Sequence, residues 1–303
     1  MARRFASLSS LAVLAAVSMP VQAKEPLRLA PSSQWHVNYA ADSCRMGRSF
    51  GTGDNEVILV LDRFQPGPMV FMSLMGKLAK VRSDVRKTVV RFGPNEREQR
   101  RNFDLVTRDN GTPVMMIGGS VLVAGNNEAW EASQIEQSER EDGAAPTPLP
   151  FIDPALNASV TSVEIDIPGA GPVVLETGAM GKPMEALTAC TSDLLRGWGI
   201  DVAAHEKLSR PATPAGDPSR WLTVSDYPLQ MRDGRQAGLV HFRLIVDEAG
   251  NPKSCHIQKS TRAKVFEDAV CEGIMKRAKF EPALDAAGKP VTSYYLNRVR
   301  FQM

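Results

Sequence analysis

Residues 238–247 alternate between apolar and polar side chains, and this pattern constrains the fold more than any other feature of the 303-residue chain. The apolar positions are Val240, Phe242, Leu244 and Val246. His241 and Arg243 take the opposite face, and Ile245 is the exception to the alternation. Because successive side chains of a strand point to opposite sides of its sheet, the pattern predicts a half-buried antiparallel strand.

The residues that follow predict a small sheet with one helix. Turn-forming residues at 247–252 precede a second strand at 253–259, so a β-hairpin is expected. Residues 263–279 carry apolar side chains at helical spacing, which predicts an amphipathic helix that ends before Pro282. Residues 291–301 form the closing strand.

These elements and their motifs resemble the carboxy-terminal domain of TonB-type energy transducers. The motifs are Asp226-Tyr-Pro228, Gly238–Asp247 with Gly250, Val265-Phe-Glu267, Ala278-Lys-Phe-Glu-Pro-Ala283 and Asp285-Ala-Ala-Gly-Lys-Pro290. The resemblance covers about residues 220–303 and implies a ββαβ fold. It also implies recognition of an extended peptide from an outer-membrane transport receptor, which is added as a strand to an exposed sheet edge.

The closing strand is the candidate peptide-binding site. In the order that the resemblance implies, this strand pairs with residues 238–247 and leaves its other side unpaired. The candidate residues are Tyr294, Tyr295, Leu296, Asn297, Arg298, Val299 and Arg300. Of these, Arg298 and Arg300 share one face with Tyr294 and Leu296. Two interpretations stay open: these side chains bind an acidic peptide, or the tyrosines only pack and the arginines only solubilise.

Two departures from the family bear on energy coupling. The resemblance implies an uncleaved membrane anchor and a long Pro-rich spacer, and neither is visible. The first histidine is His36, so the anchor histidine of the family has no counterpart. Residues 209–219, which contain three prolines and a glycine, predict an interdomain linker that reaches at most about 35–40 Å.

The first 23 residues predict a cleaved signal peptide. Arg3 and Arg4 precede an apolar stretch, and Val21-Gln22-Ala23 has the small residues that a signal peptidase reads. The apolar stretch is shorter than the roughly 20 residues of a membrane-spanning helix. We therefore expect cleavage after Ala23 and a soluble protein in the periplasm, an oxidising compartment.

Residues 24–208 predict an N-terminal β-rich α+β domain of unknown role, so the whole chain belongs to the α+β class. The strands are expected at 35–39, 56–61, 69–74, 88–92, 114–117, 160–167 and 172–176. A helix is expected at 183–198, and a mobile surface loop at 131–154. Ser43-Cys44-Arg45 and Thr188-Ala-Cys190-Thr make this domain similar to one that accompanies TonB-like modules in sphingomonad-type bacterial proteins, which implies no activity.

The two predicted domains carry opposite net charge. Residues 220–303 hold 14 Lys and Arg against 9 Asp and Glu, whereas residues 24–219 hold 20 against 25. This difference favours docking of the two domains on each other, or a basic domain that meets an acidic partner, or merely two different solvated surfaces. The mature chain has almost no net charge, which argues against nucleic-acid binding.

The four cysteines predict two disulfides, one within each domain. Cys255 points with Ile257 towards the helix at 263–279, where Cys271 lies on the flank of the packed face, so Cys255–Cys271 is expected. Cys44–Cys190 is the remaining pair. The alternative is four buried free thiols, which an oxidising compartment disfavours.

No residue constellation predicts an enzyme, a metal site or a cofactor. Cys255 and His256 are adjacent in a strand and point to opposite faces, so they are poorly placed to bind one ion. The chain has no G-x-S-x-G motif, and Glu164 and Asp166 lie on the solvent side of a strand. Three functions therefore remain: a periplasmic module that binds an outer-membrane receptor or another envelope protein, a structural envelope protein without a transport role, and an unrecognised enzyme. The sequence sets no oligomeric state.

Overall fold

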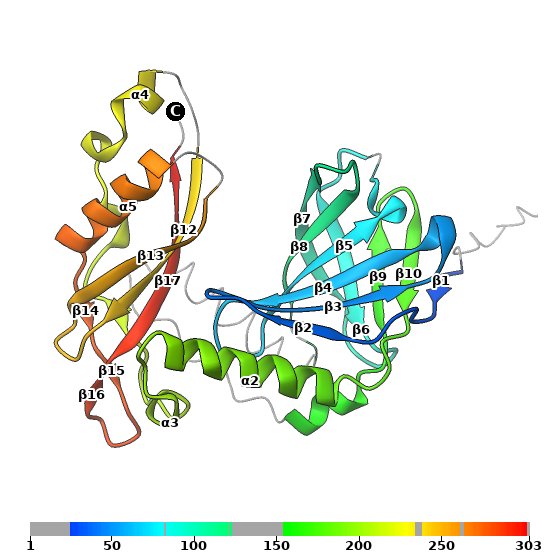
Figure 1. Ribbon diagram of the computed structural model, residues 1–303, viewed down its shortest axis with the longest axis horizontal. Helices are drawn as coiled ribbons and strands as arrows, with labels where there is room; N and C mark the ends of the chain where they lie inside the picture. The colour runs from blue at the N-terminus through cyan, green and yellow to red at the C-terminus, as the bar shows by residue number, and fades with distance from the viewer. Residues whose placement is uncertain are drawn as a thin grey trace, which may run out of the picture.

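The computed structural model describes residues 25–81, 83–120, 122, 154–233, 238–260 and 264–301. The predicted signal peptide lies outside this part of the chain, and so does the predicted loop at 131–154 except for Pro154. Figure 1 shows a large curled sheet with helix α2 along one side, and a smaller sheet with helix α5. We call residues 25–205 the N-terminal region and residues 206–301 the C-terminal region.

The N-terminal region contains one ten-stranded sheet. Its strands are β1 (Leu27–Leu29), β2 (His36–Tyr39), β3 (Cys44–Phe50), β4 (Val57–Arg63), β5 (Val70–Gly76), β6 (Lys87–Phe92), β7 (Gln99–Thr107), β8 (Pro113–Ser120), β9 (Val163–Ile167) and β10 (Gly171–Leu175). Their order is β1-β10-β9-β6-β7-β8-β5-β4-β3-β2. The short 3-10 helices in this region are η1 (Gly53–Asn55), η2 (Lys77–Ala79) and η3 (Pro154–Ser159).

The two end strands of this sheet are consecutive pieces of one segment. β1 pairs with β10, and β2, which begins seven residues after β1 ends, pairs with β3. Between them, Pro31 forms a bridge with Phe50 of β3, and the N–H of Ser32 donates to the carbonyl of Ser49. Residues 27–39 therefore connect the two ends of the sheet, and the sheet curls back on itself (Figure 1).

Helix α2 (Gly181–Gly197) closes the core of this region. Met184, Leu187 and Leu194 belong to the same buried cluster as residues of nearly every strand of the sheet. The helix begins two residues before Pro183, which the sequence places at its start. The short helix α3 (Val202–His205) follows, and Asp201 caps it by accepting hydrogen bonds from the N–H groups of Ala203 and Ala204.

The C-terminal region is built on a three-stranded sheet with the order β13-β12-β17. Its main elements are β12 (Gly238–Val246), β13 (Pro252–Ser260), α5 (Lys264–Arg277) and β17 (Ser293–Phe301). Its short elements are β11 (Thr213–Pro214), η4 (Pro218–Trp221), η5 (Val224–Asp226), α4 (Leu229–Asp233), β14 (Phe280–Glu281), β15 (Ala283–Leu284) and β16 (Pro290–Val291). The four alternating apolar residues of β12 pack with Phe266, Val270 and Ile274 of α5 in a second core.

The segment predicted to be a linker is packed into the C-terminal region. β11 pairs with β14, and the N–H of Leu284 donates to the carbonyl of Arg210 at 2.8 Å. Ala212 and Trp221, at 4% and 7% exposed, belong to the second core. Backbone hydrogen bonds and burial therefore hold much of this Pro-rich stretch against the C-terminal region. The domain boundaries themselves stay a prediction.

The structure pairs the cysteines as the sequence analysis expects. Cys44 of β3 is joined to Cys190 of α2, and Cys255 of β13 to Cys271 of α5. Each disulfide therefore fastens a strand to the helix that covers it. In the part of the chain that the structure describes, no helix has the length and apolar character needed to cross a membrane.

Candidate peptide-binding edge

Strand β17 is an edge strand. It pairs with β12 in antiparallel register along its whole length, from Ser293 opposite Val246 to Phe301 opposite Gly238. Among the described residues no strand pairs with its other side. A row of backbone N–H and C=O groups on that side is available to an added strand.

The side chains on one face of β17 belong to the core. Tyr295, Val299 and Phe301 lie on the face that α5 covers. The ring of Tyr295 is 5.1 Å from that of Phe280 and 5.6 Å from that of Trp221, and burial raises its pKa to about 12. Tyr295 therefore packs in the core of the C-terminal region.

Tyr294, on the opposite face, lies against the N-terminal region. Its ring is 5.4 Å from the ring of Trp198, in an edge contact, and stacks on the ring of His205 at 5.1 Å. Burial raises the pKa of Tyr294 and lowers that of His205 to about 4. His205 also forms a 3.1 Å hydrogen bond from Nε2 to the hydroxyl of Ser293. The start of β17 is thus held by helix α3.

The part of β17 after Tyr295 has exposed residues in its middle and a buried end, where Phe301 is 6% exposed. Asn297 and Arg298 are exposed, Leu296 and Val299 are half-buried, and the side chain of Arg300 is not among those that the structure describes. Asn297 Nδ2 donates to the hydroxyl of Tyr295 at 2.7 Å, and the N–H of Arg298 donates to Asn297 Oδ1 at 2.8 Å. A side chain of the strand itself therefore satisfies one of the backbone donors.

Asp42 connects the two regions at the opposite edge of the small sheet. Its carboxylate accepts a 2.8 Å hydrogen bond from Arg243 Nη1 of β12 and lies 2.8 Å from His256 Nε2 of β13. Its backbone carbonyl accepts a bond from the side chain of Gln258. Asp42 lies in the turn between β2 and β3, two residues before Cys44.

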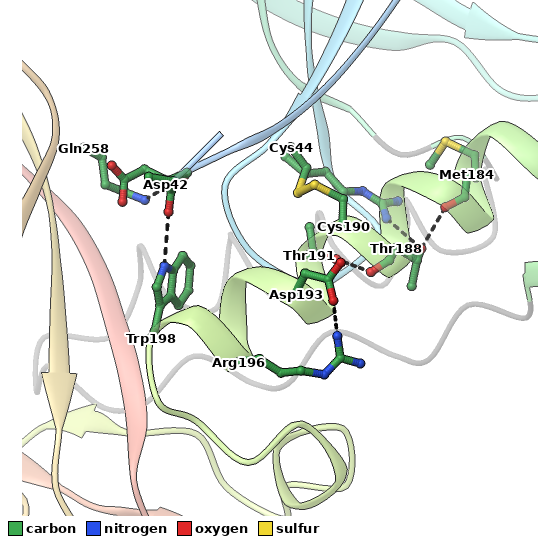
Figure 2. Close-up of a disulfide and its surroundings, with 12 residues drawn as sticks. Asp42, Cys44, Met184, Thr188, Cys190, Thr191, Asp193, Arg196, Trp198 and Gln258 are labelled. Carbon is green, nitrogen blue, oxygen red and sulfur yellow. Dashed lines mark hydrogen bonds and ion pairs between the residues drawn. A yellow bond between two sulfur atoms is a disulfide. The ribbon is translucent and has the colours of Figure 1, made fainter. Parts of the chain in front are cut away.

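Trp198, the residue after α2, completes this contact. The guanidinium of Arg243 lies 4.0 Å from the centre of the indole ring, a cation–π arrangement. The indole N–H donates to the carbonyl of Ala41 at 3.4 Å. Figure 2 shows Trp198, Asp42 and Gln258 together beside the disulfide Cys44–Cys190. A small apolar cluster of Leu195, Ile200 and Ile245 continues the contact.

Sequence reasoning did not single out Asp42, Trp198 or His205. The available signal was the opposite net charge of the two parts of the chain, which favoured docking as one of three interpretations. It could not name the residues, because Asp42 and Arg243 are 201 positions apart.

Metal-ligating side chains do not cluster among the described residues. They contain no group of three or more His, Cys, Asp and Glu side chains that could hold a metal ion. A surface cleft of the N-terminal region is lined by Arg28 and Arg91, which pair with Glu176 and Glu164. Arg48 also lines the cleft, and its guanidinium donates to the backbone carbonyls of Ser33 and Thr177, so among the described residues its positive charge is not paired with a carboxylate.

Comparison with known proteins identifies the C-terminal region. Residues 224–303 match the family model described as Gram-negative bacterial TonB protein C-terminal, so the resemblance seen in the sequence is confirmed for this part of the chain. The match establishes a TonB-like module of a transport-associated, non-enzymatic family. No curated protein matches the chain.

Proposed function

We propose that the protein is a periplasmic TonB-like module that binds an extended peptide of an outer-membrane receptor by adding it as a strand to the outer edge of β17. The observation that carries this proposal is the edge itself, a nine-residue strand paired on one side, within the segment that matches the TonB family. Main-chain hydrogen bonds supply the affinity in this mode of recognition, and side-chain contacts supply the specificity.

The contacts of β17 narrow the proposal to its later part. Tyr294 and Tyr295 are engaged within the chain, and Ser293 is 1% exposed. The peptide therefore pairs mainly along residues 296–300. Its side chains would meet Leu296 and Arg298, and the positive charge of Arg298 favours an acidic peptide.

The hydrogen bond of Arg298 identifies which backbone donors face outward. Successive N–H groups of a strand point alternately to its two edges. A donor engaged by the side chain of Asn297 is not one that pairs with β12, so we assign the N–H of Arg298 to the outer edge. The N–H of Asn297 then belongs to the ladder with β12.

This assignment yields a matched pair of proline variants. Arg298→Pro removes an outer-edge donor, which an edge strand tolerates, whereas Asn297→Pro removes a ladder donor and should destabilise the sheet. We expect Arg298→Pro to melt close to the wild type. The binding probe is a synthetic peptide copied from a receptor's extended N-terminal segment. The variant should bind this peptide about fivefold to tenfold more weakly, which corresponds to the loss of one or more hydrogen bonds.

Two controls separate backbone recognition from charge. Arg298→Ala keeps the N–H and removes the guanidinium, so a smaller, salt-dependent loss is expected. The same peptide N-methylated at successive residues lacks the backbone donors of both its edges, so it cannot add as a strand and should not bind. Wild-type affinity in a correctly folded Arg298→Pro protein, or equal binding of the methylated peptide, would reject strand addition at this edge.

A structural role without transport is the second candidate. The contacts of Asp42, Trp198 and His205 with the small sheet favour it, because they hold the C-terminal region against the rest of the chain. Pull-down from envelope extract with the full-length chain and with Arg298→Pro distinguishes the two, since only a receptor bound at the edge is lost in the variant.

A further inference from the structure

Two separate elements of the N-terminal region cover the face of the small sheet that lies opposite α5. Helix α5 occupies one face of β13-β12-β17, and the other face carries Arg243, Ile245 and Tyr294. The turn at residues 40–43 reaches β12 and β13, and residues 198–205 reach β12 and β17. Together the two elements extend across all three strands.

We propose that the N-terminal region functions as an intramolecular clamp on this face, and that Asp42, Arg243 and Trp198 hold the clamp closed. While the clamp is closed, a partner can reach the edges of the small sheet. The partner cannot reach the part of the face opposite α5 that the clamp covers. The clamp gives a function to the N-terminal region, and it holds whether or not β17 binds a peptide.

Arg243 shows that docking is part of the native state. Its side chain is 8% exposed, yet it lies on a sheet face that would be solvated if the C-terminal region stood alone. Its side chain contacts the carboxylate of Asp42 and the ring of Trp198, and both of these residues belong to the N-terminal region. A buried guanidinium is costly unless it is paired, so the position of Arg243 depends on the clamp.

Asp42 is placed to neutralise two cationic positions at once. Arg243 on β12 and His256 on β13 both contact its carboxylate. The contact agrees with the opposite net charges of the two parts of the chain. Lys259 lies opposite His241 in the β12–β13 ladder, which adds a further basic residue to that side of the sheet.

The disulfide Cys44–Cys190 holds the two elements of the clamp together even when they do not contact the small sheet. It fastens the strand that follows Asp42 to the helix that ends before Trp198 (Figure 2). Both cysteines are fully buried, so the bond fixes the spacing of the two clamp elements rather than serving as an exposed redox switch. A preorganised surface loses less conformational freedom when it docks.

The contact also contains an unsatisfied donor. The Nε of Arg243 is buried and has no hydrogen-bond partner among the described residues. An unpaired buried donor reduces the net stability of the contact. The interface is therefore held by a few polar interactions, and removal of one of them should open it measurably.

The test uses Asp42→Asn, Arg243→Met and the double variant in the full-length protein. Hydrogen exchange followed by mass spectrometry reports on residues 198–205, 241–245 and 293–296, and small-angle X-ray scattering reports on the spacing of the two regions. Each single variant should raise deuterium uptake in all three segments by at least twofold and increase the radius of gyration. The double variant should add little, because both changes remove the same contact.

A matched control lies on the same face of the sheet. Arg298→Gln removes an exposed arginine outside the clamp and should leave exchange and scattering unchanged. Asp42→Asn alters only a turn residue, so it keeps the test valid if Arg243→Met folds poorly. Unchanged exchange in Asp42→Asn, or fully additive effects in the double variant, would overturn the clamp.

Discussion

The two sheets of this protein differ in whether their edges are left unpaired. In the N-terminal region, one segment of residues 27–39 supplies both end strands, so the ten-stranded sheet curls back on itself. The three-stranded sheet of the C-terminal region leaves β13 and β17 as edges. Unpaired edges accept further strands, and closed sheets do not. Of the two, the small sheet is therefore the one suited to strand addition.

The sheets also differ in how their faces are covered. The large sheet packs its inner face on α2, within its own region. The small sheet has α5 on one face and depends on the N-terminal region for part of the other. The small sheet is thus open at its edges, covered by α5 on one face and partly covered on the other, which directs a partner to the edges.

The largest expected effect compares the two disulfides. Cys44–Cys190 closes a sequence separation of 146 residues and Cys255–Cys271 one of 16. Chain-entropy reasoning predicts that replacing the first pair by Ala lowers the free energy of unfolding by about 5 kcal/mol, and replacing the second by about 3 kcal/mol. Denaturant unfolding followed by circular dichroism measures both. Equal losses would show that the length of the closed loop does not determine how strongly each disulfide stabilises the fold.

The next effect concerns the turn that joins β12 to β13. Gly250 has a φ of 78°, and an added Cβ would lie 1.9 Å from the carbonyl oxygen of Phe280. Gly288 has a similar φ of 76° with nothing within 4 Å of such a Cβ. Gly288→Ala should cost about 1 kcal/mol for the left-handed conformation alone. Gly250→Ala should cost about 3 kcal/mol or more, because the backbone must also move.

Thermal melts of the two glycine variants provide the measurement. If Gly250→Ala and Gly288→Ala melt at the same temperature, the close approach between the turn and residue 280 contributes nothing. The turn would then accommodate the added Cβ at residue 250 more easily than its packing indicates.

A pH effect follows from His205 at the junction of the two regions. Burial lowers its pKa from 6.5 to about 4, so the folded state favours the neutral ring. Between these values the unfolded chain binds the proton and the folded protein does not. The free energy of unfolding is therefore unaffected by His205 above about pH 6.5 and falls as the pH approaches 4, by about 3 kcal/mol in total. Urea unfolding at a series of pH values measures this loss.

His205→Phe is the control for this prediction. The variant keeps a flat ring against Tyr294 and removes the titrating group. The slope of stability against pH between 6.5 and 4 should become shallower in the variant. An unchanged slope would assign the acid sensitivity to other groups.

The smallest effect concerns the free edge of β17. Asn297→Ala releases the N–H of Arg298 and so exposes one more unpaired donor. Tyr295→Phe removes the hydroxyl that accepts a hydrogen bond from the Asn297 amide and should act in the same direction, more weakly. We expect Asn297→Ala to strengthen self-association by about fivefold, the value of about 1 kcal/mol. Analytical ultracentrifugation tests this, and unchanged association would argue against protection of the edge by Asn297.

Much of the small sheet could be predicted because its signals are local. The strand at 238–247 and the helix at 263–279 agree with β12 and α5 to within two residues at each end. In the large sheet, the sequence analysis did not predict β1, β3 and β7. β7 buries Gln99 and Arg101, which hydrogen-bond to each other at 2.8 Å, so polar residues occupy positions where the alternation rule expects apolar ones.

The sequence by itself determined the α+β class and the TonB-like character of the last 80 residues, because periodicity and motif spacing are properties of short stretches. It also determined the cysteine pairing, because each of the two predicted domains contains two cysteines. Tertiary structure alone decided that residues 209–215 are packed rather than free, and that Asp42 meets Arg243. An ion pair between residues 201 positions apart depends on how two sheets, each with its own core, come together. No local pattern encodes that geometry.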